Sequence, residues 1–320
     1  MFQISADKSI TFCTIPDMIL LFTLICVKAR QYRIRITALC IMYNHFHLQA
    51  SGHTREDVEC FMHAVAWAFA IIYNRHYGLG GQLFRHPFGS ALKVKPQKIT
   101  GNWIYIANNP VGKKAVTRAW DYRWNFLRYA PELDARSSQL KYSPSSRHPF
   151  SEEYQPLEAS KEMLYLVKAV RNRASDGEII DYDFFSSPRY ASLSEKERLQ
   201  LIDIIITSYN IIDYEPMLRK YGSVEHFCRV LEEVEGNEYD LSDDWEPEDY
   251  RHYRQMIAIA AEEGYDLRRQ RYAGRDASEN RGQAMPEALA ERLVRRFKTE
   301  VGATDIETGK FLKIKNYGSK

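Results

Sequence analysis

The segment from Arg33 to Ala50 constrains the fold most, because its polar and apolar residues alternate with a period of two. This pattern is typical of antiparallel strands with one face on a hydrophobic core and the other on solvent. Tyr43 and Asn44 interrupt the apolar run, so we expect a turn there between two strands. The solvent face of this hairpin is then expected to hold Arg33, Arg35, Thr37, Tyr43, His45, His47 and Gln49.

The residues before and after this hairpin predict an α+β fold. Before it, the largely apolar ten-residue run from Met18 to Val27 indicates a buried helix, and a short strand is expected at residues 1–4 or 9–13. After it, a capping box from Thr54 to Asp57 begins a helix that reaches about Asn74. This order of elements predicts an antiparallel sheet with helices on one face.

Two further segments follow that helix. Residues 82–94 (QLFRHPFGSALKV) are rich in aromatic and basic side chains and predict an irregular strand pair. Pro96 opens a second amphipathic helix, which we expect Pro110 to stop. Tyr105 and Asn109 are four positions apart in this helix and therefore share one of its faces.

Composition and charge narrow the classes of function. The five cysteines are scattered and form no C-x-x-C pair, which fits a reducing cytoplasm. The longest apolar run is half of the roughly 20 residues that a membrane-spanning helix needs, so we expect no membrane segment. Residues 1–130 hold 16 Lys and Arg against 6 Asp and Glu, whereas residues 131–320 hold 28 against 36. A basic half joined to an acidic half predicts a polyanion-binding domain with a tail of different function, although charge also segregates between domains by chance.

The second half of the chain is predicted to form a separate, mainly α-helical domain. We expect the first domain at residues 1–135, a Ser- and Pro-rich linker at 136–156 and a helical accessory domain at 157–320. Residues 286–314 place a basic amphipathic helix before a short turn and a second helix, a pattern compatible with a helix-turn-helix. An ordinary helical hairpin explains this pattern equally well.

His45 and His47 lie two positions apart in a predicted strand, so both imidazoles project from the same face. Two imidazoles do not complete a metal site, because a catalytic ion usually has three protein ligands. The amide oxygen of Asn109 is a candidate third ligand, and Tyr105, one helical turn away, is a candidate nucleophile for a phosphate that the ion polarises. Taken singly, the same residues are also typical of half-exposed histidines, a core aromatic side chain and the C-terminal end of a helix.

Four motifs in order along the chain, CIMYNHFHL, YNRHYGLGGQLFRHPF, YIANNPV and YRWNF, resemble the single-tyrosine HUH transposases, in particular the REP-associated group. The resemblance covers roughly residues 30 to 130. The His-hydrophobic-His motif falls on residues 45–47, and the tyrosine and Asn-Pro motif falls on Tyr105 and on Asn109 with Pro110. The family usually has a proline where this chain has Tyr43.

The resemblance implies a ferredoxin-like antiparallel sheet with helices, the HUH nuclease fold, followed here by the helical domain. It also implies a transposase that nicks and joins single-stranded DNA beside hairpins such as repetitive palindromes. Tyr105 would attack the scissile phosphate and form a 5′-phosphotyrosine, while His45, His47 and Asn109 hold Mg²⁺ or Mn²⁺. Such a protein is expected to be a cytoplasmic, nucleoid-associated monomer or homodimer. Its DNA-binding residues are expected to be Arg33, Arg35, Arg85, His86, Phe88, Lys93 and Lys95.

Two other functions remain open from the sequence. A domesticated, catalytically silent protein that keeps the sheet and the basic face would bind DNA hairpins without needing Tyr105. An H-x-H metallohydrolase on a barrel would need repeating β-α units or a β-rich remainder, and the helical patterns after residue 157 supply neither.

Overall fold

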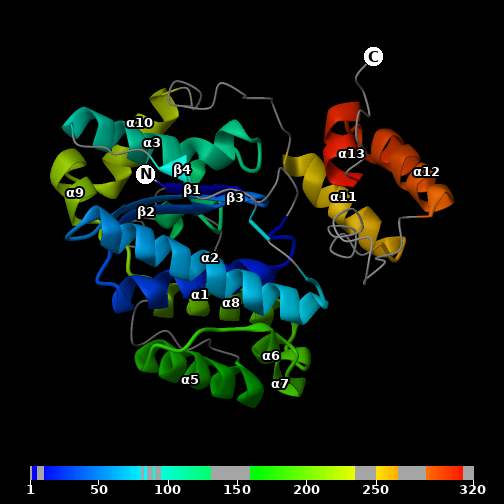
Figure 1. Ribbon diagram of the computed structural model, residues 1–320, viewed down its shortest axis with the longest axis horizontal. Coiled ribbons are helices and arrows are strands. Elements are labelled where there is room, and N and C mark those ends of the chain that lie inside the picture. Colours follow the sequence, from blue (N-terminus) through cyan, green and yellow to red (C-terminus); the bar gives the residue numbers. More distant parts are fainter. Residues whose placement is uncertain are drawn as a thin grey trace.

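A four-stranded antiparallel sheet lies at the centre of the protein (Figure 1). The computed structural model describes residues 2–5, 11–80, 83–84, 89–90, 95–130, 159–234, 250–265 and 286–312, with the backbone alone at 2–5, 89–90, 250, 251, 287, 306 and 310. The strands are β1 (Phe2–Ser5), β2 (Arg35–Ile41), β3 (His45–Ser51) and β4 (Gly89–Ser90), in the order β2-β3-β1-β4. The α+β class is confirmed, and the N-terminal strand is the first of the two expected alternatives.

The hairpin of β2 and β3 turns at Tyr43 and Asn44, as predicted, and the backbone N–H of Met42 donates to the carbonyl of His45 at 2.8 Å. The alternation along β2 is broken by a bulge between Ile36 and Ala38. Because one extra residue moves the following side chains to the opposite face, Ala38 and Cys40 share the face of the histidines. The expectation of one apolar and one polar face along this whole segment is therefore wrong.

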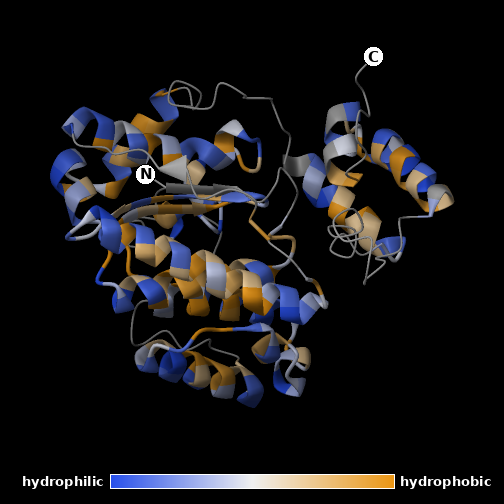
Figure 2. Ribbon diagram, viewed as in Figure 1, coloured by the Kyte–Doolittle hydropathy of each residue, from blue (hydrophilic) through white to orange (hydrophobic). Residues whose placement is uncertain are grey.

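Two helices cover one face of the sheet, α1 (Ile15–Gln31) and α2 (Arg55–Tyr77). Each begins with a capping box, from Thr14 to Asp17 and, as predicted, from Thr54 to Asp57. The two boxes satisfy backbone N–H groups that the first helical turn leaves unpaired. Their apolar sides pack with Phe46 and Leu48 of β3, and Figure 2 shows hydrophobic residues concentrated in this layer.

The opposite face of the sheet is covered by α3 (Pro96–Gly112) together with the short helices η1 (Ala119–Asp121) and η2 (Phe126–Tyr129). Pro110 does not stop α3: it lies inside the helix, which ends at Gly112, and the N–H of Lys113 still donates to the carbonyl of Asn109. This face is buried, with His45 at 8% and His47 at 0% relative exposure. The prediction that both histidines lie on a solvent face is therefore wrong, because α3 packs on that face.

The edge strand β2 is paired along its outer side by two loops. The carbonyl of Trp124 accepts from the N–H of Ile41 at 3.0 Å, and the N–H of Asp213 donates to the carbonyl of Ile36 at 2.8 Å. These contacts satisfy groups that an open sheet edge would expose. The loop around Asp213 also joins α8, which packs against α1, to the segment that leads to α10 on α3.

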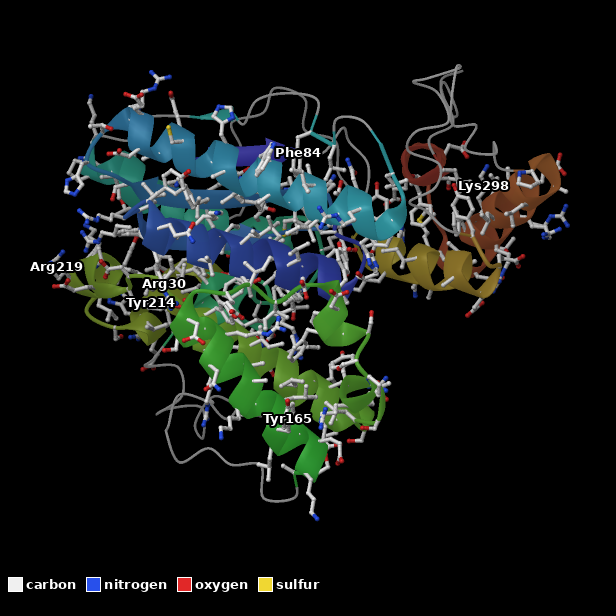
Figure 3. All side chains as sticks on the ribbon, turned by 60° about the horizontal axis from the view of Figure 1, so that its bottom comes forward. Arg30, Phe84, Tyr165, Tyr214, Arg219 and Lys298 are labelled. Carbon is white, nitrogen blue, oxygen red and sulfur yellow. The ribbon has the colours of Figure 1, made fainter. Side chains whose placement is uncertain are left out.

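Six helices of residues 159–234 pack around this core. They are α5 (Lys161–Asp176), α6 (Tyr182–Phe185), α7 (Pro188–Ala191), α8 (Glu195–Tyr209), α9 (Glu215–Tyr221) and α10 (Val224–Glu233). Helix α8 packs against α1 and α5 packs against α8, so that α5 to α7 form an outer layer (Figures 1 and 3). Helix α10 lies on α3, where the amide of Asn108 donates to the carbonyls of Leu231 and Val234. The domain boundaries near residues 135 and 157 stay predictions, and these helices share their hydrophobic clusters with the sheet.

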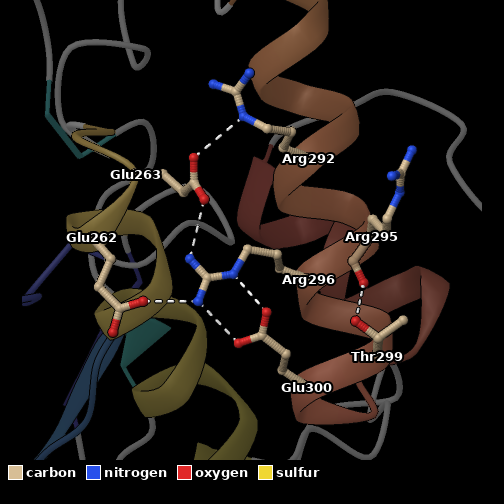
Figure 4. Close-up of polar contacts among 7 residues, drawn as sticks. All are labelled: Glu262, Glu263, Arg292, Arg295, Arg296, Thr299 and Glu300. Atoms are coloured by element: carbon tan, nitrogen blue, oxygen red, sulfur yellow. Dashed lines mark hydrogen bonds and ion pairs between the residues drawn. The ribbon is translucent and has the colours of Figure 1, made fainter.

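A small group of helices follows, α11 (Tyr250–Glu262), α12 (Glu287–Arg296), the π-helical turn η5 (Phe297–Val301) and α13 (Asp305–Leu312). Arg296 of α12 forms ion pairs with Glu262, Glu263 and Glu300, and Arg292 pairs with Glu263 (Figure 4). Two arginines of the basic helix are thus bound to carboxylates within the group, and the helix-turn-helix at 286–314 stays a prediction. Within the described part of the chain, no helix has both the length and the apolar character needed to cross a membrane.

Candidate active site

The candidate site lies between β3 and α3, where the two predicted histidines meet the predicted tyrosine and asparagine. The imidazoles of His45 and His47 are neighbours, with ring centroids 4.7 Å apart. The Oη of Tyr105 lies 3.3 Å from Nε2 of His47, and Nδ2 of Asn109 lies 3.2 Å from the same nitrogen. Tyr105 and Asn109, 58 and 62 positions away from His47 in the chain, therefore meet at Nε2 of His47, and His45 lies beside that ring.

Three polar contacts hold α3 in register with the sheet. The amide of Asn102 donates to Gln49 of β3 at 2.5 Å, and the indole N–H of Trp103 donates to Thr37 of β2 at 3.3 Å. From the loop that bridges to Cys40 of β2, the amide of Asn125 donates to the carbonyl of Ala107 at 2.8 Å. Buried polar groups are costly when unpaired, so these bonds favour one position of α3 along the sheet. That position places Tyr105 next to His47.

His47 is suited to act as a neutral ligand. Burial lowers its pKa well below the usual value, and the charges of His45 and Lys113 lower it further. An imidazole with a lowered pKa is uncharged at neutral pH and keeps a lone pair on one ring nitrogen. The same charge repulsion disfavours protonation of both histidines together.

The lowered pKa of His47 predicts that acid destabilises the protein. The unfolded chain binds a proton on this residue near pH 6.5 and the folded protein does not, so the free energy of unfolding falls as the pH drops below about 6.5. One such group contributes a slope that approaches about 1.4 kcal/mol per pH unit. We expect urea unfolding in EDTA, measured from pH 7.5 to 5, to show this loss and His47→Gln to flatten it. An equal slope in the variant would contradict the assignment.

The residues present fit a divalent metal ion. Among the residues that the structure describes, Oδ1 of Asn109 and Nδ1 of His47 are buried without a hydrogen-bond partner. A half turn of the Asn109 amide exchanges Nδ2 and Oδ1, so that an oxygen faces the histidine. Nδ1 of His45 lies 2.6 Å from Oδ1 of Asn44, a contact that leaves its Nε2 as the ligating atom. The described residues contain no cluster of three or more His, Cys, Asp or Glu that could bind a metal.

Three of the seven predicted DNA-binding residues are described, and they lie at the starts of β2 and α3. Arg33 is exposed, with a positive φ of 54°, and precedes β2. Arg35 forms an ion pair with Asp213, which offsets its charge, and Lys95 is exposed just before α3. The other four residues expected to contact DNA lie outside the described residues: Arg85, His86, Phe88 and Lys93.

Several residues of the site were not singled out by the sequence. The sequence places Asn44 only in a turn. An asparagine next to a candidate ligand histidine can also orient the imidazole, as Oδ1 of Asn44 does with Nδ1 of His45. Gln49 and Asn102 form the clamp between β3 and α3, and no spacing rule links residues on different elements. The charge of Lys113 lowers the pKa of His47. The position of Lys113 after the Asn-Pro pair does not indicate that the two side chains interact.

Comparisons with known proteins do not assign the chain to a family. No protein-family model, no curated protein and no solved structure matches it. The functional argument therefore rests on the motifs and on the geometry of the site.

Proposed function

We propose that this protein is a metal-dependent enzyme that nicks and joins single-stranded DNA, a transposase of the single-tyrosine HUH class. The observation that carries the proposal is the position of the Tyr105 hydroxyl, 3.3 Å from Nε2 of His47 and on the same helix face as Asn109. A phenol beside two imidazoles and an amide is a suitable arrangement for attack on a polarised phosphate. The strand order β2-β3-β1-β4, with α1 and α2 on one face, agrees with a ferredoxin-like sheet and supports the same proposal.

In the proposed reaction, Oη of Tyr105 attacks the phosphorus of a phosphodiester. The bond between phosphorus and the 3′ oxygen breaks as the bond to Oη forms, and the departing 3′ oxygen gains the proton that the phenol loses. The 5′ end remains joined to Tyr105 as a phosphotyrosine. The reaction exchanges one phosphodiester for another, so the energy of the bond is kept in the phosphotyrosine. A 3′ hydroxyl that later attacks this phosphotyrosine can therefore join the strand without an external energy source.

His45, His47 and Asn109 would hold Mg²⁺ or Mn²⁺ in this site. When bound, the ion would position and polarise the phosphate and so lower the barrier to attack by a weakly nucleophilic phenol. The chain itself keeps Tyr105 in place through α3 and keeps His47 uncharged through burial. Positioning of the nucleophile is a large part of catalysis in such reactions.

A second function is favoured by the closure of the site. Tyr105 is only 7% exposed and His47 is fully buried, so a scissile phosphate must displace part of the cover before it reaches the phenol. A domesticated protein that binds DNA hairpins without cleaving them would have no need of that opening. The two functions differ in one product, a covalent protein–DNA adduct.

The proposal is tested by incubating the protein with single-stranded hairpin oligonucleotides taken from the DNA that flanks its gene. With Mn²⁺ present, we expect a covalent adduct on a denaturing gel, and a free 3′ hydroxyl on the released strand. EDTA is expected to abolish both products. Mass spectrometry of the adduct is expected to place the nucleotide on the peptide that contains Tyr105.

Other outcomes separate the alternatives. Hairpin binding without an adduct or a nick would favour the silent DNA-binding protein. An adduct that persists in EDTA would contradict the role of the metal, and absence of both binding and cleavage across the tested hairpins would overturn the assignment to hairpin DNA.

A further inference from the structure

Arg254 of α11 contacts the two segments that adjoin the elements of the candidate site, the turn before β3 and the turn after α3. Its Nε donates to the hydroxyl of Tyr43 at 3.0 Å, and its Nη2 donates to the carbonyl of Ala115 at 3.0 Å. Tyr43 lies in the turn just before β3, and Ala115 lies just after α3. One guanidinium, 211 positions away from Tyr43 in the chain, therefore bridges the histidine strand and the tyrosine helix.

The turn that Arg254 contacts is close to the candidate ligands. Tyr43 is followed by Asn44, whose Oδ1 lies 2.6 Å from Nδ1 of His45. The carbonyl of Tyr43 accepts from the N–H groups of Thr11 and Phe12, at 2.9 and 2.8 Å. The backbone of the turn is thus held by the segment just before α1, whereas its tyrosine hydroxyl is held from α11.

The end of α3 is the second point of contact. After the helix ends at Gly112, the chain turns through Lys114, which has a positive φ of 54°. The N–H of Ala115 donates back to the carbonyl of Pro110 at 2.8 Å, and its own carbonyl accepts from Arg254. Pro110 directly follows Asn109, so this turn is linked to the candidate third ligand through one residue.

We propose that Arg254 is a positioning residue, which ties the His45 turn to the end of the Tyr105 helix and makes the docked α11–α13 group part of the active site. The fork of an arginine suits this task, because its donors are held in a fixed plane and contact two acceptors at once. The proposal rests on the proposed function of the site. It gives the C-terminal helices a role in catalysis: when they are docked, the histidines and the tyrosine are held at the distance that the reaction needs.

The test uses the full chain with Arg254→Ala, Arg254→Lys and Tyr43→Phe. We expect Arg254→Ala to lower the rate of adduct formation with hairpin DNA by at least about tenfold and to raise the Mn²⁺ concentration needed for half the maximal rate, because the ligands are less well placed. Arg254→Lys keeps the charge and one contact, so an intermediate rate is expected. Tyr43→Phe removes one of the two acceptors and should fall between Arg254→Lys and wild type.

Arg30→Ala is the matched control. Arg30 also donates to a backbone carbonyl from a distant segment, to Ala174 at 2.9 Å, but it joins α1 to α5 away from the site. Its rate and Mn²⁺ dependence are expected to stay within about twofold of wild type. If Arg30→Ala loses as much activity as Arg254→Ala, the effect is general destabilisation and the positioning role is overturned.

A second readout separates this proposal from the proposed function. Hydrogen–deuterium exchange at the N–H groups of Met42 and Ala115, which donate to His45 and Pro110, is expected to be faster in Arg254→Ala than in Arg30→Ala. If wild type forms no adduct, the strand-transfer function fails, but the exchange comparison still tests the bridge. Unchanged exchange, or an unchanged or faster adduct rate in Arg254→Ala, overturns the proposal.

Discussion

Replacement of Tyr105 by phenylalanine is expected to lower the rate of covalent adduct formation by at least about 1,000-fold, the effect typical of removing a catalytic nucleophile. The substitution removes only the hydroxyl that lies 3.3 Å from Nε2 of His47 and keeps the buried ring. The free energy of unfolding should change by no more than about 1 kcal/mol, since one modest hydrogen bond is lost. Single-turnover gels with Mn²⁺ measure the rate, and urea unfolding measures the stability.

Tyr122→Phe is the matched control for this substitution. Tyr122 is also buried near the sheet, and its hydroxyl donates to the carbonyl of Ile41 at 3.0 Å rather than to a histidine. We expect this variant to lose about 1 kcal/mol of stability and to keep the adduct. An adduct of normal rate in Tyr105→Phe would show that another residue is the nucleophile.

Sequence periodicity predicted the elements that build the site. The alternation around His45 and His47 indicated a hairpin, and the structure has β2, a turn at Tyr43 and β3 there. The spacing of four between Tyr105 and Asn109 predicted a shared helix face, and both side chains contact His47. These signals are local, because the periods of strands and helices are set by the backbone itself. The roles of these residues in metal binding and attack stay predictions.

The environment of these elements was not predictable from the same signals. A period of two in the sequence does not reveal the bulge between Ile36 and Ala38. It also does not distinguish a face exposed to solvent from a face covered by a helix, so the face of His47 was wrongly expected to be exposed. Pro110 was expected to stop α3, but a proline only removes its own N–H donor and clashes one turn back, and two further residues remain helical. The contact of Arg254 with Tyr43 depends on how distant helices pack, which no local pattern encodes.

Asn109 and Asn108 provide a test in which two neighbouring, identical side chains are expected to have opposite effects. The amide of Asn109 faces His47, whereas the amide of Asn108 donates to the carbonyls of Leu231 and Val234 at the end of α10. Successive residues of a helix point about 100° apart, which explains the division. We therefore expect Asn109 to take part in the reaction and Asn108 to stabilise the packing of α10 on α3.

Asn109→Ala is expected to lower the adduct rate by at least about 100-fold at a fixed Mn²⁺ concentration, because a candidate ligand oxygen is lost. Its free energy of unfolding should fall little, since the substitution removes the contact with His47 but also removes Oδ1, which is buried without a hydrogen-bond partner among the described residues. Mn²⁺ binding, followed by electron paramagnetic resonance without DNA, should weaken in parallel.

Asn108→Ala is expected to do the reverse. It leaves two carbonyls at the end of α10 without this donor, so the free energy of unfolding should fall by about 1–3 kcal/mol, while Mn²⁺ binding stays unchanged. If both variants lose stability and neither loses Mn²⁺ affinity, Asn109 is a structural residue and the metal site lacks its third ligand. If only Asn109→Ala loses Mn²⁺ affinity and adduct formation together, the amide serves the ion, because a packing defect would not separate the two neighbours in this way.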